Sequence, residues 1–412
     1  MPFTPCGANT AGFEAANRNP FIPGRRQMMK IPLGRRSDAF TLVPVMWCRI
    51  VLLLLLGLLS GNALAELRVL TWNLGGNGLT NWSVDMPQVQ AVGRILRHLQ
   101  PDVVALQELP NENRGYANLD AFAQTYLPGF TNFYSSGTDG ILRSGFLSRH
   151  PVRRFQSHLD GVPLIDFGSS GRFTRDLFEA EVEVPGFPTP VHVFTVHLKA
   201  GSDANSIAVR AAEASAISNH VVRVLPALFP GRPFILMGDF NEDVSRPRDV
   251  ARNPIPRLTN SATTLVMLNA TNPVTQRPET WSSRFSLNTR LDYILASGGL
   301  AATASSATVF RADRVNPLPE GMLRDDSATA SDHLPVMAIF GPVKPILFRI
   351  TEASESAGIV SLTWEADSGI GYRVEKSTDL RNWIQATATR ATNRMAFPVA
   401  ASPEYYRVLR VQ

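Results

Sequence analysis

Cysteine is almost absent from this chain of 412 residues, where it occurs only at Cys6 and Cys48. Both positions precede a small-x-small motif, Ala63 to Ala65, that predicts cleavage by a signal peptidase. The mature chain would then contain no thiol at all. This excludes disulfides, a cysteine nucleophile and a thiolate zinc site together.

Long apolar runs are also missing. The one strongly apolar segment, residues 50–59, follows Arg49 and is shorter than the ~20 residues that a membrane-spanning helix needs. A basic flank and a short apolar core predict a cleavable secretory signal that ends near Ala65. We therefore expect residues 1–65 to be removed and the mature protein to be secreted or periplasmic, without stable membrane association.

Two alternatives concern this N-terminal segment. The apolar run could act as an uncleaved anchor. Residues 1–45 are rich in Arg and Pro without periodicity, and they stand awkwardly in front of a signal. Initiation at Met46, or at Met28 or Met29, would explain them better than a folded domain.

An excess of one charge is missing from the mature chain, although the whole sequence has a net charge of +5 and a pI near 9.5. Of 40 Lys and Arg residues, seven lie in residues 1–65; of 35 Asp and Glu residues, two lie there, so 33 of each sign remain. Any affinity for nucleic acid must therefore come from a local patch of charge.

What the chain does have is polar residues at the ends of apolar, strand-like segments. After the apolar residues 234–237, Gly238 interrupts the run, and Asp239 and Asn241 follow two apart, so their side chains project to the same side of an extended backbone. A carboxylate and an amide at the mouth of a sheet suit a hard divalent cation and a phosphate oxygen. Alone, the pattern is also typical of an ordinary turn.

The same construction recurs along the chain. Apolar segments that end in polar residues deliver Asn73, Glu108, His197 with Lys199, Asp292, and Asp332 with His333. Packing does not explain so many polar strand ends, so we expect them to converge on one reaction centre.

Five motifs in this order resemble the endonuclease/exonuclease/phosphatase superfamily. They are Thr-Trp-Asn-Leu, Val-Ala-Leu-Gln-Glu, Gly-Asp-Phe-Asn, Leu-Asp-Tyr-Ile and Ser-Asp-His-Leu-Pro-Val, and they spread from Leu67 to Phe340. The resemblance implies an α+β fold, a four-layer αββα sandwich, over residues 66–341. A linker at 342–345 would join it to a small all-β sandwich at 346–412, which resembles a fibronectin-III module with Trp364 and Tyr406 as core aromatics.

Local patterns agree with such a mixture of elements. Residues 89–99 and 208–225 have apolar residues at helical spacing and predict two helices. Residues 146–152 and 178–184 alternate with period two and predict half-buried strands.

A metal site follows from the resemblance. Glu108 is the best candidate ligand, because a carboxylate after an apolar run is costly to place there without a partner. The family pattern implies that Asn73 helps to hold the metal or the phosphate and that Asp332 contributes to a second ion position. Oxygen ligands predict Mg²⁺, with Mn²⁺ as a substitute.

The resemblance also implies catalytic roles. His333 and His197 would be the two imidazoles of the site, and Asp292 would accept a hydrogen bond from His333 and favour its charged form. Asp239 would orient or deprotonate the attacking water, and Asn241 would hold a phosphate oxygen.

Three further positions bear on phosphate binding. Arg175 matches an arginine that lies near the phosphate in deoxyribonuclease-like members, but a surface salt bridge with Asp176 or Glu179 is an alternative. Lys199 would add positive charge at the opposite wall. Gly75 stands where apurinic endonucleases carry an acid, which departs from that pattern.

Three classes of function remain open from the sequence. We expect a monomeric, metal-dependent phosphoesterase that cleaves phosphodiester bonds in nucleic acid. The alternatives are a phosphoesterase for phospholipid head groups or inositol phosphates, and a protein that only binds. The segment 76–84 and the segment 310–330, with Arg311, Arg314 and Arg324, are predicted to rim the site.

Overall fold

The structure is a computed structural model that describes residues 65–75, 82–110, 115–282, 286–342, 350–365, 371–378, 383–398 and 405–411. The predicted signal before Ala65, most of the predicted linker and residues 76–81 of the predicted rim lie outside these ranges. The domain boundaries therefore stay predictions. Among the described residues, no helix is both long and apolar enough to cross a membrane.

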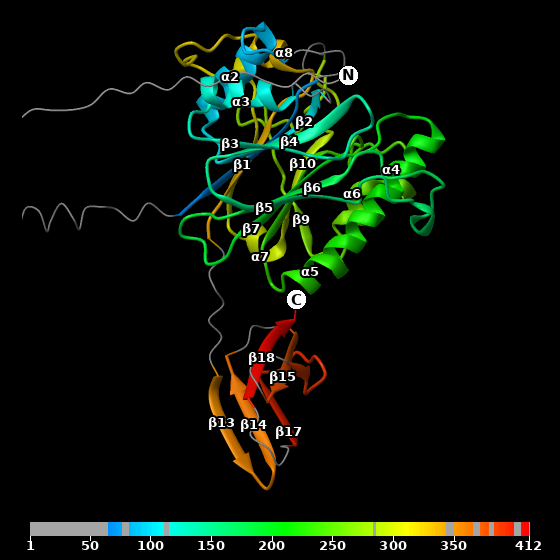
Figure 1. Cartoon of the computed structure of the whole chain (residues 1–412), viewed down its shortest axis with the longest axis vertical. Helices are drawn as coiled ribbons and strands as arrows, with labels where there is room; N and C mark the ends of the chain where they lie inside the picture. Colours follow the sequence, from blue (N-terminus) through cyan, green and yellow to red (C-terminus); the bar gives the residue numbers. More distant parts are fainter. Residues whose placement is uncertain are drawn as a thin grey trace, which may run out of the picture. The chain divides into compact units, whose positions relative to one another are not determined.

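Two six-stranded sheets form the centre of the fold (Figure 1). The first contains, in spatial order, β11 (Ala304–Val309), β12 (Val336–Phe340), β1 (Leu67–Asn73), β2 (Val103–Pro110), β4 (Leu142–Ser148) and β3 (Thr131–Tyr134). The second contains β5 (Val152–His158), β6 (Leu177–Val182), β7 (Val191–His197), β8 (Phe234–Asp239), β10 (Asp292–Ser297) and β9 (Leu265–Met267).

Helices cover the outer faces of both sheets, as Figure 1 shows. Those on the first sheet are α2 (Pro87–Leu99), α3 (Gly115–Tyr126) and α8 (Asp326–Ala330), and those on the second are α4 (Ala204–Asn219), α5 (Leu225–Leu228) and α6 (Pro254–Leu258). The short elements are α7 (Gly298–Ala301), the π-helical η2 (His220–Val224) and the 3₁₀ turns η1 (Ile165–Phe167), η3 (Val250–Arg252) and η4 (Ala312–Arg314). The predicted four-layer αββα sandwich is confirmed.

Three apolar clusters correspond to the three interfaces between these layers. One lies between the sheets and contains Phe146 and Phe178, whose ring centroids are 5.2 Å apart. The other two join each sheet to its helices. The predicted strand at 146–152 instead covers the end of β4, a bend and the start of β5. β4 and β6 are buried on both faces, so the prediction of half-buried strands is wrong there, because period two in the sequence does not reveal that helices cover the outer face.

The two predicted helices are present with shifted bounds. α2 ends where Gln100 adopts a left-handed conformation (φ 50°) just before Pro101. α4 begins earlier than predicted, because the side chain of Asp203 accepts hydrogen bonds from the backbone N–H groups of Asn205 and Ser206 and caps the helix. The second helix was predicted to continue to residue 225, but α4 ends at Asn219 and the next residues, 220–224, form η2.

Strand direction brings the polar residues to one edge. β1 and β2 run parallel, as do β7 and β8, with His197 opposite Asp239. β10 runs antiparallel to β8, with Asp292 opposite Asp239, and β12 runs antiparallel to β1. Asp292 and His333 thus stand at or before the beginnings of their strands, not at the ends as predicted, and the reversed direction is what places them at the same edge.

The C-terminal residues form two antiparallel sheets of three strands. One contains β13 (Ile350–Ser356), β14 (Ile359–Trp364) and β17 (Arg394–Pro398), and the other contains β16 (Ile384–Gln385), β15 (Gly371–Ser377) and β18 (Tyr405–Val411). Trp364 is buried in their shared core, as predicted, while Tyr406 is half-buried and packs on Phe397 with ring centroids 4.9 Å apart. Likeness to a fibronectin-III module stays a prediction.

Candidate active site

Asn73 holds two carboxylates together at the end of β1. Its Nδ2 donates to Glu108 Oε1 and to Asp239 Oδ2, both at 2.9 Å, and its Oδ1 accepts from the backbone N–H of Gly75 at 2.9 Å. The side chain is fully buried. Asn73 therefore spaces the two acids across the two sheets, and its predicted role as a ligand stays a prediction.

The direction of Glu108 depends on an irregularity in β2. The pairing of β2 with β4 shifts between Leu106 and Leu109, and Glu108 has a positive φ of 61°, a rare conformation for a residue with a Cβ. The neighbouring Gln107 is fully buried, and its Nε2 donates to Thr71 Oγ1 (3.0 Å) and to Thr195 Oγ1 (2.9 Å) of the opposite sheet. Because of this bulge, Gln107 can join the two sheets while the next residue, Glu108, supplies a carboxylate to the site.

His197 lies beside both acids. Its Nε2 is 3.5 Å from Asp239 Oδ2 and 3.8 Å from Glu108 Oε1. Burial lowers the pKa of His197 well below its usual value, and the positive charges of Arg175 and His333 lower it further. At neutral pH this imidazole is therefore uncharged.

His333 has the opposite electrostatic character. Its Nδ1 lies 2.8 Å from Asp292 Oδ2, and its Nε2 lies 3.9 Å from Asp239 Oδ2. Burial by itself would lower the pKa of His333, but the charge and hydrogen bond of Asp292, with a smaller contribution from Asp239, raise it to about 10. The predicted contact with Asp292 is thus present, and His333 is positively charged at neutral pH.

Asp239 is the buried carboxylate between the two imidazoles. Burial raises the pKa of Asp239; His333 opposes this rise and Asp292 adds to it, so that the pKa reaches about 7. The backbone N–H of Asn241 donates to Asp239 Oδ1 at 2.8 Å, and Asn241 Nδ2 donates to Leu198 O at 3.0 Å. Asn241 has a positive φ of 52°, so the turn after β8 folds back on the carboxylate.

Arg175 does not form either predicted salt bridge. It is buried, with Nη2 on Asp139 Oδ2 at 2.5 Å and Nη1 on the carbonyl oxygen of His197 at 3.1 Å. The two acids named as its alternative partners bind elsewhere: Asp176 accepts from Ser135 Oγ at 2.7 Å. Arg175 therefore supports the backbone of His197, a contact that sequence reasoning missed because Asp139 lies in a loop without a recognisable pattern.

The other predicted partner, Glu179, belongs to a separate buried cluster. Arg154 Nη2 lies 2.9 Å from both of its oxygens, His158 Nε2 lies 2.7 Å from Oε2, and His192 Nδ1 lies 2.5 Å from Oε1. Burial alone would raise the pKa of Glu179, but these partners lower it to about 2. This cluster lies on β5, β6 and β7, away from the acids of the site.

The ammonium group of Lys199 makes no hydrogen bond or ion pair with the described residues. Its backbone N–H donates to Glu213 Oε2 at 2.7 Å, and its carbonyl accepts from Arg210 Nη1 at 2.7 Å. Its predicted contribution of positive charge stays a prediction.

Asp332 lies at the rim, where its Oδ2 accepts from Trp281 Nε1 at 3.2 Å. Asp332 also explains why Gly75 stands at the position where apurinic endonucleases carry an acid. That residue has a φ of 57°, and a Cβ there would lie 2.6 Å from Asp332 Oδ1. An acid at position 75 would have to displace the Asp332 carboxylate and would be strained by the positive φ, so glycine is favoured there.

Two groups of acidic and imidazole ligands lie within reach of a single ion. Glu108, His197 and Asp239 form one, and Asp239, Asp292 and His333 form the other; in each, the ligand atoms lie within 4.8 Å of one another. Asp332, predicted at a second ion position, belongs to neither group.

The donor set fits a hard cation at Glu108. Both oxygens of Asp239 already accept hydrogen bonds, and Asp292 Oδ2 is occupied by His333. Asp292 Oδ1 and Glu108 Oε2 have no hydrogen-bond partner in the described part of the chain, but Asp292 is fully buried, whereas the side chain of Glu108 is 16% exposed. An open carboxylate oxygen beside other acids suits Mg²⁺ or Mn²⁺.

Two packed sheets with buried carboxylates and two imidazoles at one edge fit the reaction centre of a phosphoesterase. The chain belongs to the endonuclease/exonuclease/phosphatase family, whose sequence model matches residues 70–333. The C-terminal sheets lie beyond this match. No curated protein sequence matches the chain.

Several solved structures are similar to the chain at low identity. Truncated Caenorhabditis elegans TDP2 is 19% identical, with 67% of this chain and 98% of that chain covered and a TM-score of 0.46. An endonuclease/exonuclease/phosphatase from Bacteroides vulgatus is 14% identical, with 67% and 99% covered and a TM-score of 0.49. D. rerio TDP2 complexed with a single-strand DNA product is 16% identical, with 67% and 99% covered and a TM-score of 0.46. At such identities the likeness concerns the fold alone.

Proposed function

We propose that this protein is a divalent-metal-dependent phosphodiesterase that hydrolyses nucleic acid. The observation that carries the proposal is the pairing of Asp239 with His333, in which Asp239 Oδ2 lies 3.9 Å from His333 Nε2. The pKa of Asp239 is about 7, and that of His333 is about 10. Two neighbouring groups with separated pKa values are typical of a base and a cationic partner that act on one substrate.

Each residue of the cluster has a role in this proposal. Asp239 accepts a proton from the attacking water, since a base with a pKa near the working pH is the most effective. His333 presents a fixed positive charge to the phosphoryl oxygens, and Asp292 keeps that charge in place. His197 is neutral and offers an N–H from Nε2, the nitrogen that faces the acids. A cation bound at Glu108 would neutralise negative charge on the phosphoryl group.

Trp281 supports nucleic acid as the substrate. Its indole is 37% exposed, and its N–H donates to Asp332, the residue before His333. An exposed aromatic face held beside the reaction centre suits stacking on a base, which is worth about 1–3 kcal/mol per base.

The test is a panel of substrates offered to the purified mature protein with Mg²⁺ or Mn²⁺. DNA and RNA should be cleaved, and excess chelator should abolish turnover. Glu108→Gln should need far more metal for the same rate, while Asp120→Asn, at an exposed position of α3, should behave as the wild type. Full turnover in excess chelator would contradict the metal mechanism.

The variant Trp281→Ala tests whether the substrate is nucleic acid or one of the alternative phosphoesters. It should lower kcat/KM on nucleic acid by about ten- to a hundredfold through lost stacking, whereas Trp281→Phe should retain most of the activity. Hydrolysis of inositol phosphates or sphingomyelin in preference to DNA and RNA would replace the proposed substrate.

We also propose that the protein is exported, on the basis of the sequence signal that ends near Ala65. N-terminal sequencing of exported material should begin at or near Glu66. A mature protein that starts before Met46 would show that the segment is not a signal.

A further inference from the structure

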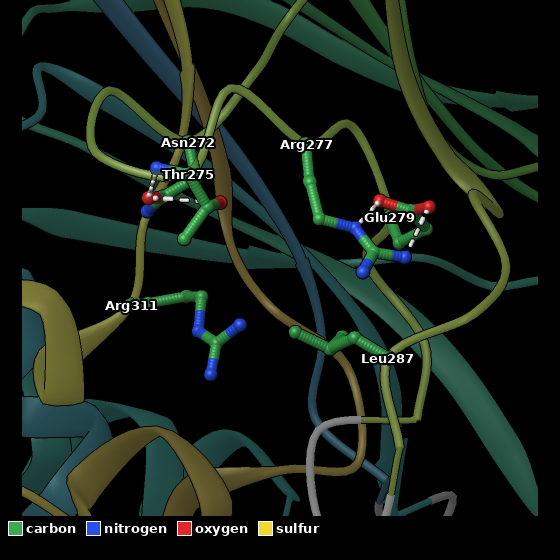
Figure 2. Close-up of a pocket in the computed structure, with 6 residues that line it drawn as sticks. All are labelled: Asn272, Thr275, Arg277, Glu279, Leu287 and Arg311. Atoms are coloured by element: carbon green, nitrogen blue, oxygen red, sulfur yellow. Dashed lines mark hydrogen bonds and ion pairs between the residues drawn. The ribbon is translucent and has the colours of Figure 1, made fainter.

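A cavity of about 310 Å³ lies next to the reaction centre. Leu334, which directly follows His333, lines it together with Leu287, Arg311, Asp313, Arg324 and Asp325. A smaller cavity of about 30 Å³ shares Leu287 and Arg311 with it. Figure 2 shows the side chains of Arg311 and Leu287 projecting toward one another.

The walls of the larger cavity are held in place. The backbone N–H of Ala312 donates to Ser327 Oγ at 2.9 Å, which joins the segment of Arg311 to α8. On the other side of α8, Arg94 from α2 donates to the buried Asp326 from Nε at 3.0 Å and from Nη2 at 2.5 Å. The cavity is therefore part of the rigid fold.

The opposite wall is connected to the reaction centre. Leu287 packs against the apolar cluster between the sheets. Asn288 N–H donates to Trp281 O at 3.1 Å, and the indole of Trp281 in turn binds Asp332. Leu334 N–H donates to Thr280 O at 2.8 Å. A ligand in the cavity would therefore lie beside the residues that surround His333.

The cavity has unused guanidinium N–H donors. Arg311 donates to Asp313 from Nε at 3.0 Å and from Nη2 at 2.8 Å, which leaves three of its five N–H groups. Arg314 Nε also lies 3.3 Å from Asp313 Oδ2. Arg324 is exposed and makes no hydrogen bond or ion pair with the described part of the chain. In the lining of the cavity, the two guanidinium groups of Arg311 and Arg324 stand beside the two carboxylates of Asp313 and Asp325.

We propose that this cavity binds the nucleotide next to the scissile bond, with its phosphate on Arg311 and Arg324 and its sugar on the side chains of Leu287 and Leu334. This inference rests on the proposed function. Guanidinium groups match phosphate oxygens in pairs, and an aliphatic floor suits the apolar face of a sugar. The volume is at the small end of ligand sites, so the cavity accommodates one monomer unit.

Two variants test the cavity on two substrates. Arg311→Gln and Arg324→Gln are compared with wild type on a single-stranded oligonucleotide and on a small chromogenic phosphodiester that ends at the scissile phosphate. On the oligonucleotide, each change should lower kcat/KM by about tenfold or more, the usual effect of losing a hydrogen bond to a charged group. The loss on the small diester should be much smaller, because that substrate does not reach the cavity.

Salt dependence gives a readout that a structural role would not change. The slope of log kcat/KM against log salt on the oligonucleotide should become shallower by about 0.7 for each arginine that contacts a phosphate. Arg223→Gln is the matched control, since it removes the same charge at an exposed residue of η2 that does not line the cavity. It should leave both the rate and the slope nearly unchanged.

The outcomes separate this inference from the proposed function. Unchanged rates and slopes for both variants on every oligonucleotide that the wild type cleaves would overturn the inference alone. Equal losses on the oligonucleotide and the small diester would also overturn it. A wild-type protein that cleaves the small diester but no nucleic acid would instead overturn the proposed function, and the inference with it.

Discussion

Replacing Asp292 with Asn should remove the charge that keeps His333 protonated while preserving the shape of a fully buried side chain. The rise of the pKa of His333 from 6.5 to about 10 corresponds to roughly 5 kcal/mol in favour of the imidazolium. Without Asp292, burial opposes that charge with less compensation, so the pKa should fall toward or below 6.5. At pH 8 most of His333 would then be neutral.

The assay is turnover of a chromogenic phosphodiester between pH 5.5 and pH 9. At pH 8 Asp292→Asn should lose about 10²–10³ in kcat, the usual cost of losing one group that stabilises charge in the transition state. The ratio of variant to wild-type rate should rise as the pH falls, because acid restores the imidazolium in the variant, whereas His333→Ala should show no such recovery. The reasoning is refuted if Asp292→Asn turns over normally at pH 8, or if the ratio does not depend on pH.

The same pair affects stability with a definite sign. His333 has a raised pKa in the folded state, so the pair stabilises the fold fully below about pH 6.5, and this contribution is lost as the pH rises toward about 10. Thermal unfolding of the wild type and of Asp292→Asn should therefore converge at high pH, which also checks that the variant is folded during the activity assay.

Three further predictions concern other parts of the chain. Because the pKa of Glu179 falls from 4.5 to about 2, Glu179→Gln should lower the free energy of unfolding by about 3 kcal/mol at pH 7 and by progressively less as the pH falls from 4.5 to 2. Equal losses at pH 7 and pH 3 in urea unfolding would contradict this. His333→Ala combined with Asp239→Ala should be barely slower than the slower single variant, since both serve one transition state; multiplicative losses in kcat would mean that they act separately. Truncation after Gly341 should leave a folded, active catalytic domain by thermal unfolding and turnover, and a folded but inactive product would show that the C-terminal sheets complete the site.

The sequence predicts much of the reaction centre because its residues stand beside apolar strands in recognisable motifs. The motifs place Glu108, His197 and Asp239 at strand ends and Asp292 and His333 beside strands, and all five lie at one edge of the sheets. Motifs within single strands could not reveal strand direction, which is why Asp292 was expected at the end of a strand that it begins.

The contacts that the sequence could not predict join residues that are far apart in the chain. Gln107 stands inside a motif, and a buried amide in an apolar strand signals a structural contact, but its hydroxyl partners are fixed only by how the sheets pack. Asp139, the partner of Arg175, lies in a loop that has no periodic pattern. The cavity at Arg311 and Arg324 was expected as a rim, and its depth arises from the packing of α8 against α2.

The pairing of β1 with β12 has a consequence for when the enzyme becomes active. Thr71 stands opposite Val336, and the indole of Trp72 binds the carbonyl of His333 across 261 positions of sequence. A chain still being synthesised carries Asn73 and Glu108 long before it carries the strand that positions His333. Contacts of such high sequence separation carry a large loop-closure cost and slow folding. We therefore expect hydrolytic capacity only after β12 has been made and paired with β1, and we expect fragments that end before β12 to be inactive.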